Sequence, residues 1–164
     1  MAAANPDELV LVPFTAEALP KAEPWFDDPE TRRWLEDRKW PAMALRLATE
    51  PPVERRGKRA LRRETFLAME NGSPVALADT EMYQDGTASF AFVVEPSRRG
   101  RGVCRRVALA LRAYLADQGV HELFAGAEPD NLASIRCLEA AGFRPRSELA
   151  DSEGFLYFAC LLST

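Results

Sequence analysis

Three apolar-rich runs with interspersed polar residues follow one another in the middle of the chain, and each ends at a turn or loop signal. The runs cover residues 64–70, 73–83 and 88–95, with an Asn-Gly pair at 71–72 and an Asp-Gly pair at 85–86 between them. The third run is a short stretch rich in Phe and Val, typical of a buried strand, and the two dipeptides favour tight hairpin turns. We therefore expect three consecutive antiparallel strands.

One face of the second run changes character along its length. Residues two apart lie on the same side of a strand, and this side carries Val75, Leu77, Asp79, Glu81 and Tyr83. The face begins apolar and becomes acidic. We expect it to run from the core into a cleft.

The third run ends at Pro96 and leads into a loop that carries Gly100 and Gly102 among arginines. A helical stripe of apolar residues follows, from Val103 to Tyr114. Glycines let a ligand approach the backbone, and the first N–H groups of a helix suit an anion such as a pyrophosphate. The three-glycine dinucleotide motif and the Gly-Lys-Ser/Thr nucleotide motif are both absent. The simpler alternative is a basic surface loop that caps a helix.

The flanking sequence completes the predicted order of elements. A strand at 120–127 follows the helix, and it should run parallel to the third strand because the helix crosses between them. The other expected elements are strands at 8–15, 144–149 and 154–162, and helices that start near residues 16, 28, 41 and 131.

Composition limits the partners. The 164 residues are 28% charged with a formal net charge of −4, which gives no general case for nucleic-acid binding. For the basic run from Arg55 to Arg63 we favour a solvated loop or strand edge over contact with a coenzyme phosphate or an acidic partner. We expect no membrane segment and no signal peptide. Three widely spaced cysteines favour reduced thiols in the cytoplasm, and a single histidine gives no metal signature.

Two motifs resemble the GNAT family of N-acetyltransferases. Arg99, Gly102 and Cys104 match its Gln/Arg-x-x-Gly-x-Gly/Ala motif, with cysteine where glycine or alanine is usual. The pattern Asn-x-x-Ser-Ile-Arg-x-x-Glu-x-x-Gly-Phe then matches from Asn131 to Phe143. This second segment looks most like the branch of ribosomal-protein alanine acetyltransferases and aminoglycoside 6′-acetyltransferases. The resemblance is detailed from residue 71 onward and extends to the N-terminal part only in element order.

The resemblance implies one α/β (α+β) domain over residues 1–164. Its mixed, mostly antiparallel sheet should have six to seven strands and about four flanking helices. A central parallel pair of strands should splay apart around the coenzyme. Residues 1–63 would form the acceptor-side helices and residues 64–164 the coenzyme-binding core.

The implied activity is transfer of an acetyl group from acetyl-CoA to a primary amine of a small molecule or a protein N-terminus, by direct attack on the thioester. No metal and no membrane partner is implied, and a homodimer is left open. The residues expected to contact the coenzyme are Phe92, Val93, Val94 and Asn131 for pantetheine, with a backbone N–H near Val94 facing the thioester oxygen, and Arg99, Gly100, Arg101, Gly102, Val103, Cys104 and Arg105 for the pyrophosphate.

The catalytic groups are less defined by the motifs. The base candidates are Glu81, Asp79 and Glu128, with Glu95 less suitable because it adjoins the phosphate loop. Many relatives carry a tyrosine acid seven residues after the motif asparagine, but Leu138 stands there. Tyr83 or Tyr157 could replace it, or the thiolate could leave unassisted; we select Glu81, Glu128 and Tyr83. We interpret Cys137 as packing rather than as an acetyl carrier. The alternative function is an acyl-CoA-binding sensor or interaction module without turnover.

Overall fold

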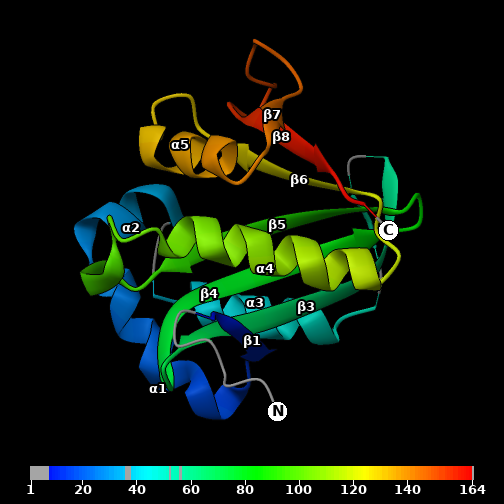
Figure 1. Ribbon diagram of the computed structural model, residues 1–164. Helices are drawn as coiled ribbons and strands as arrows, with labels where there is room; N and C mark the ends of the chain where they lie inside the picture. Colours follow the sequence, from blue (N-terminus) through cyan, green and yellow to red (C-terminus); the bar gives the residue numbers. More distant parts are fainter. Residues whose placement is uncertain (1–7, 36–37, 52, 56, 164) are drawn as a thin grey trace.

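The computed structural model describes residues 8–35, 38–51, 53–55 and 57–163, and it places one mixed sheet between helices (Figure 1). Its strands are β1 Val10–Pro13, β2 Glu54–Arg55, β3 Lys58–Glu70, β4 Ser73–Tyr83, β5 Thr87–Val94, β6 Glu122–Ala127, β7 Arg144–Pro145 and β8 Leu156–Leu161. Its α-helices are α1 Leu19–Ala22, α2 Pro29–Leu35, α3 Trp40–Thr49, α4 Val103–Asp117 and α5 Leu132–Ala140, with short 3₁₀ turns at Ala16–Ala18, Glu23–Asp27 and Pro96–Arg98.

The strand order in the sheet is β1-β3-β4-β5-β6-β8-β7, with the two-residue strand β2 added alongside β3. Neighbouring strands are antiparallel except for β5 and β6, which are parallel. The predicted fold class, with its single central parallel pair, is confirmed. The strand expected at 144–149 shortens to two residues, because the Ser147 hydroxyl bonds the backbone N–H and C=O of Leu149 and closes a local turn instead of a ladder.

The β3–β4 hairpin forms as predicted, but β3 starts earlier than its hydrophobic pattern suggests. Asn71 and Gly72 both adopt positive φ, 51° and 77°, as a type I′ turn requires. The strand then extends back to Lys58, paired with β4 from Ala60 onward and with β2 at Lys58 and Arg59, so most of the basic run lies in the sheet. Of the two forms expected for this run, a solvated loop or a strand edge, residues 58–63 form a strand; Arg56 lies outside the described residues.

Helices cover both faces of the sheet. Helix α4 lies in front of the sheet in Figure 1. Its Leu111 and Val107 belong to the same buried cluster as Ala78 and Phe90 of the sheet. On the opposite face, Phe26 and Trp25 pack on Leu67, Leu77 and Val93. From Ala76 onward the side chains of β4 alternate between these two layers. Val75 was expected on the same face as Leu77, but it packs in the α4 layer with Ala76, because the register of β4 against β3 is irregular at this point.

A disulfide joins α4 to α5, which corrects the expectation of three reduced thiols. Cys104 in the first turn of α4 is bonded to Cys137 of α5, with their Cα atoms 6.0 Å apart. Cys160 is a buried free thiol. The sequence could not indicate the pair, because the two cysteines are 33 positions apart and a strand with its crossover lies between them. No helix in the described part of the chain is both long and apolar enough to span a membrane.

Candidate active site

The two parallel strands separate partway along their length. Thr87, Ala88 and Ser89 of β5 pair with residues 122–124 of β6, and the ladder stops there. Beyond it, β5 remains paired with β4 as far as Val94, while β6 remains paired with β8. Each strand therefore turns one edge of backbone N–H and C=O groups toward the gap. An extended ligand can bind such edges as an added strand.

The glycine loop forms an open cradle at the start of α4. Gly100 and Gly102 have φ of 74° and 73°, which only glycine adopts without strain, and Gly102 is the N-cap. A side chain built on Gly100 would meet nothing within 4 Å. The first N–H groups of this 15-residue helix have no partner within the helix, and its first turn holds no acidic residue. The cradle thus presents donors and the positive end of the helix dipole to an anion.

Two motif side chains of this loop turn away from the cradle. The guanidinium of Arg99 binds Asp28, at 2.8 Å between Nη1 and Oδ2, and also the Thr31 hydroxyl. Asp28 in turn accepts the Thr31 N–H at the start of α2, and this bond, followed by Arg99, lowers the pKa of Asp28 below its ordinary value. Cys104 turns to α5 through its disulfide. Arg99 therefore ties the loop to α2, and Cys104 leaves the cradle open.

The second motif begins α5. Asn131 is buried, and its Oδ1 accepts the N–H of Ser134 at 3.3 Å, so it caps the helix, which starts where it was expected. Leu138, at the position where the family pattern has tyrosine, is 2% exposed and packs in the core. Glu128 accepts the Asn131 N–H through its backbone and does not line the cavity described below. Glu95 caps the 3₁₀ turn by accepting the N–H of Ser97.

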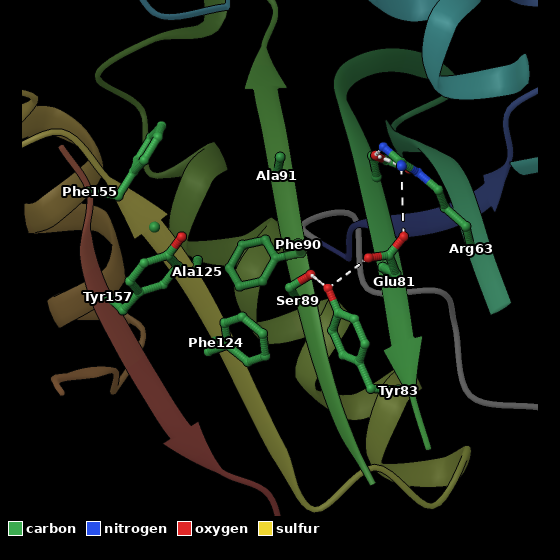
Figure 2. Close-up of a pocket in the computed structure, with 12 residues that line it drawn as sticks. Arg63, Glu81, Tyr83, Ser89, Phe90, Ala91, Phe124, Ala125, Phe155 and Tyr157 are labelled. Atoms are coloured by element: carbon green, nitrogen blue, oxygen red, sulfur yellow. Dashed lines mark hydrogen bonds and ion pairs between the residues drawn. The ribbon is translucent and has the colours of Figure 1, made fainter. Parts of the chain in front are cut away.

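A cavity of about 250 Å³ opens where the strands begin to separate (Figure 2). The acidic end of the β4 face, Asp79, Glu81 and Tyr83, forms one side, and the core residue Leu77 precedes it on the same face. The predicted passage from core to cleft is confirmed. The other lining residues are Arg63, Ser89, Phe90, Ala91, Phe124, Ala125, Gly126, Phe155 and Tyr157.

Polar side chains in the cavity form a connected network (Figure 2). Nε of Arg63 lies 3.1 Å from both carboxylate oxygens of Asp79, and its Nη1 lies 3.8 Å from Oε2 of Glu81. The Tyr83 hydroxyl donates to Oε1 of Glu81 at 2.7 Å and lies 3.1 Å from the Ser89 hydroxyl. The carboxylates of Asp79 and Glu81 are only 7% and 11% exposed.

Burial and ion pairing act in opposite directions on the charged groups of this network. Burial raises the pKa of Asp79 above its ordinary value, although Arg63 opposes the shift. Burial also disfavours the charged form of Arg63, but the hydrogen bond and charge of Asp79 outweigh it and raise the pKa of Arg63. The Arg63 guanidinium therefore favours the ionised form of Asp79 against the cost of its burial.

Sequence reasoning placed Glu81, Tyr83, Asp79 and Tyr157 as candidates, and the cavity brings all four together. It missed Arg63, which was assigned to a solvated run. The missing information was the register: Arg63 is the direct neighbour of Glu81 in the β3–β4 ladder. Other basic residues of the run also have acidic partners, with Lys58 bound to Asp85 and Arg62 to Glu64. Among the described residues, no group of three or more His, Cys, Asp or Glu is placed to hold a metal ion.

Comparisons with solved structures define the class of fold. The aminoglycoside acetyltransferase AAC(6′)-Ib with coenzyme A and kanamycin is 21% identical, with a TM-score of 0.74 over 94% of this chain and 95% of that chain. The same protein with acetyl-CoA gives a TM-score of 0.75 at 21% identity, over 94% of each chain. An acetyltransferase from Thermus thermophilus gives 0.72 at 21% identity, over 94% of this chain and 97% of that chain.

The fold is therefore the one that acetyltransferases of this type share. Residues 8–144 match the family model described as "Acetyltransferase (GNAT) domain". This chain belongs to the GNAT acetyltransferase family. Comparison with curated proteins gives no significant match.

Proposed function

We propose that the protein is an N-acetyltransferase that moves the acetyl group of acetyl-CoA to a primary amine. The observation that carries this proposal is the end of the β5–β6 ladder at Ser89 and Phe124, between the glycine cradle and the buried carboxylate cavity. Acetyl-CoA is a long molecule with a diphosphate in its middle and a thioester at its tip. It could therefore place the diphosphate in the glycine cradle, its arm in the gap between β5 and β6, and the thioester at the cavity. The solved structures with acetyl-CoA or coenzyme A and an aminoglycoside add support by analogy of fold.

In this proposal the diphosphate binds the main chain from Gly100 to Arg105. The pantetheine arm lies in the gap along Phe92, Val93 and Val94, with Asn131 on the opposite side. The thioester would reach the point where the gap opens into the cavity, next to Ala91 and Ala125, which line it. This point lies about three residues before Val94 along β5. A main-chain N–H of β5 that faces the gap there would stabilise negative charge on the thioester oxygen.

The reaction needs a neutral amine and a route for its proton. The amine nitrogen forms a bond to the thioester carbon, the carbon–sulfur bond breaks, and the proton passes to Glu81 directly or through one water. Tyr83 holds the Glu81 carboxylate in place by its 2.7 Å hydrogen bond. The coenzyme thiolate, with a pKa of about 8.5 like that of cysteine, can leave with a proton from Tyr83 or without one.

A transfer assay with a panel of primary amines, read by mass spectrometry of the acetylated product, tests the proposal. We expect transfer by the wild type and a loss of kcat of about 10²-fold or more in Glu81→Gln, in the range of general-base contributions. Glu128→Gln tests the other selected carboxylate in the same assay; because Glu128 does not line the cavity, we expect this variant to keep its activity. Tight binding of acetyl-CoA without transfer to any amine would refute the enzyme and favour the sensor.

A further inference from the structure

Residue 106 holds two consecutive carbonyl groups of the cradle. Its backbone N–H donates to the Gly102 C=O at 3.1 Å, at the start of α4. Its side-chain Nη1 donates to the Arg101 C=O at 2.9 Å. Arg106 therefore fixes the orientation of both peptide groups that flank the Cα of Gly102, the first through its side chain and the second through its main chain.

The orientation of these carbonyls decides where the donors of the cradle point. In a trans peptide group the C=O and the N–H that follows it lie on opposite sides, and the described chain contains no cis peptide bond. The carbonyls of Arg101 and Gly102 are held toward residue 106. The N–H groups of Gly102 and Val103 therefore point the opposite way, out of the start of α4. Both belong to the main-chain segment that the proposed function assigns to the diphosphate.

The guanidinium of Arg106 is itself anchored to the sheet. Its Nη2 donates to Oε2 of Glu70 at 2.7 Å, and Glu70 is the last residue of β3, directly before the Asn-Gly turn. The side chains of Glu70 and Arg106 are 18% and 30% exposed, so much of this ion pair is shielded from water. Hydrogen bonds between ionised groups are shorter and stronger than neutral ones. The β3–β4 hairpin thus supplies a fixed point from which Arg106 reaches the loop.

Close contact with Gly102 completes the arrangement. A side chain built on Gly102 would come 3.3 Å from Nη1 of Arg106, and the φ of 73° at this position favours glycine in any case. At the other end of the loop, Arg99 is bound to Asp28 of the segment before α2. The loop is therefore fastened at both ends, each time by an arginine that binds within the fold.

We infer that Arg106 is a positioning residue for coenzyme binding, which acts through the Arg101 carbonyl and depends on Glu70. The inference rests on the proposed function, because it takes the cradle to be the diphosphate site. Donors that are already oriented bind an anion more tightly than donors that have to be ordered during binding. The competing interpretation is that Arg106 attracts the phosphates only by its positive charge, and it predicts a different response to lysine at this position.

Calorimetric titration with coenzyme A measures the effect without turnover. We expect Kd to rise about 10- to 100-fold in Arg106→Met, the range of a lost hydrogen bond to a charged group. The rise should be smaller in Glu70→Gln, which keeps the shape of the side chain and removes its charge. Arg106→Lys keeps the charge but loses the planar fork of donors, so its Kd should stay close to that of Arg106→Met.

Arg112→Met is the matched control. Arg112 lies further along α4 and also donates from Nη1 to a backbone carbonyl, that of Ala141, at 2.7 Å. This contact joins α4 to the end of α5 and does not involve the cradle. We therefore expect Arg112→Met to bind coenzyme A like the wild type.

A thioester without a diphosphate separates positioning from general disruption of the enzyme. In the transfer assay we expect Arg106→Met to raise KM for acetyl-CoA about 10- to 100-fold with kcat nearly unchanged, because the lost contact serves binding and not the chemical step. S-Acetylpantetheine lacks the diphosphate, so Arg106→Met should use it with the same kcat/KM as the wild type. An equal loss of kcat/KM for both thioesters would overturn the inference.

Each further outcome decides one of the two claims. Unchanged affinity for coenzyme A in Arg106→Met, full recovery in Arg106→Lys or an equal loss in Arg112→Met would overturn the positioning role and leave the acetyltransferase proposal standing. Absence of transfer to every amine would overturn the proposed function, and the calorimetric series would still decide the role of Arg106. Should Arg106→Met fail to fold, equal affinities of Glu70→Gln and the wild type would refute the inference.

Discussion

The Cys104–Cys137 disulfide should make a large contribution to stability, and its size follows from the loop that it closes. The bond links residues 33 apart in sequence. In the chain-entropy model, closing a loop of this length in the unfolded state is worth about 3.7 kcal/mol at 25 °C. One kcal/mol corresponds to about 2–4 °C in Tm for a chain of this size. We therefore expect reduction to lower Tm by about 7–15 °C.

Thermal unfolding followed by circular dichroism, with and without a thiol reductant, measures this shift. Reduction is the cleanest perturbation, because it removes the cross-link and leaves both side chains in place. The double variant Cys104→Ala/Cys137→Ala should unfold close to the reduced wild type and should not respond to reductant. Cys160 is present in the wild type and in the double variant, so any effect of the reductant on this free thiol is the same in both. A reductant shift below about 2 °C, or a similar shift in the double variant, would refute the reasoning.

Three further predictions address the cradle, the cavity and the surface. Gly102→Glu should abolish coenzyme A binding in calorimetry, whereas Gly119→Glu, with the same positive φ at the other end of α4, should retain it; equal binding by both variants would mean that the cradle is misplaced. Arg63→Met should cost about 3–5 kcal/mol in urea unfolding at pH 7, because it leaves the buried carboxylate of Asp79 without its guanidinium partner. The folded-state pKa of Asp79 then rises further above its unfolded value, so stability should recover as pH falls toward 4; a loss that is constant with pH would contradict this. The pKa of Asp85 is lowered to about 2, chiefly by the hydrogen bond from the Thr87 hydroxyl. Its contribution is present above the unfolded pKa of about 3.9 and is lost as pH falls toward 2, so Asp85→Asn should reduce the acid sensitivity of unfolding in that window, and an unchanged pH profile would argue against it.

Local signals predicted the parts of this molecule that depend on neighbours in sequence. The Asn-Gly turn, the change of one β4 face from Leu77 in the core to Asp79, Glu81 and Tyr83 in the cavity, and the glycine loop before α4 each involve residues a few positions apart, and the structure has all three. The parallel pairing of β5 and β6 followed from one further rule, the crossover of a helix between them.

Contacts between segments that are distant in the chain could not be predicted from sequence patterns. The pairing of Arg99 with Asp28, 71 positions apart, depends on how α2 docks against the glycine loop. The position of Arg63 beside Glu81 depends on the register of β3 against β4. The sequence did not indicate this register, because a run of basic residues does not resemble a typical buried strand. In both cases an arginine of a basic segment forms an ion pair within the fold. Basic runs near a binding site therefore need register information before their charge can be assigned to a ligand.

The place of Leu138 in the core determines where a proton donor can lie. Because Leu138 is 2% exposed and packed in the core, the α5 position that carries tyrosine in the family pattern cannot serve the thiolate here. Tyr83 lies two residues after Glu81 on β4, and its hydroxyl contacts both Glu81 and the Ser89 hydroxyl of β5, at the last paired position before the strands separate. A base and a phenol on the same strand face keep a fixed spacing, because residues two apart on a strand point the same way. In the proposed reaction β4 would therefore carry both proton-transfer groups, and α5 would position the coenzyme through Asn131.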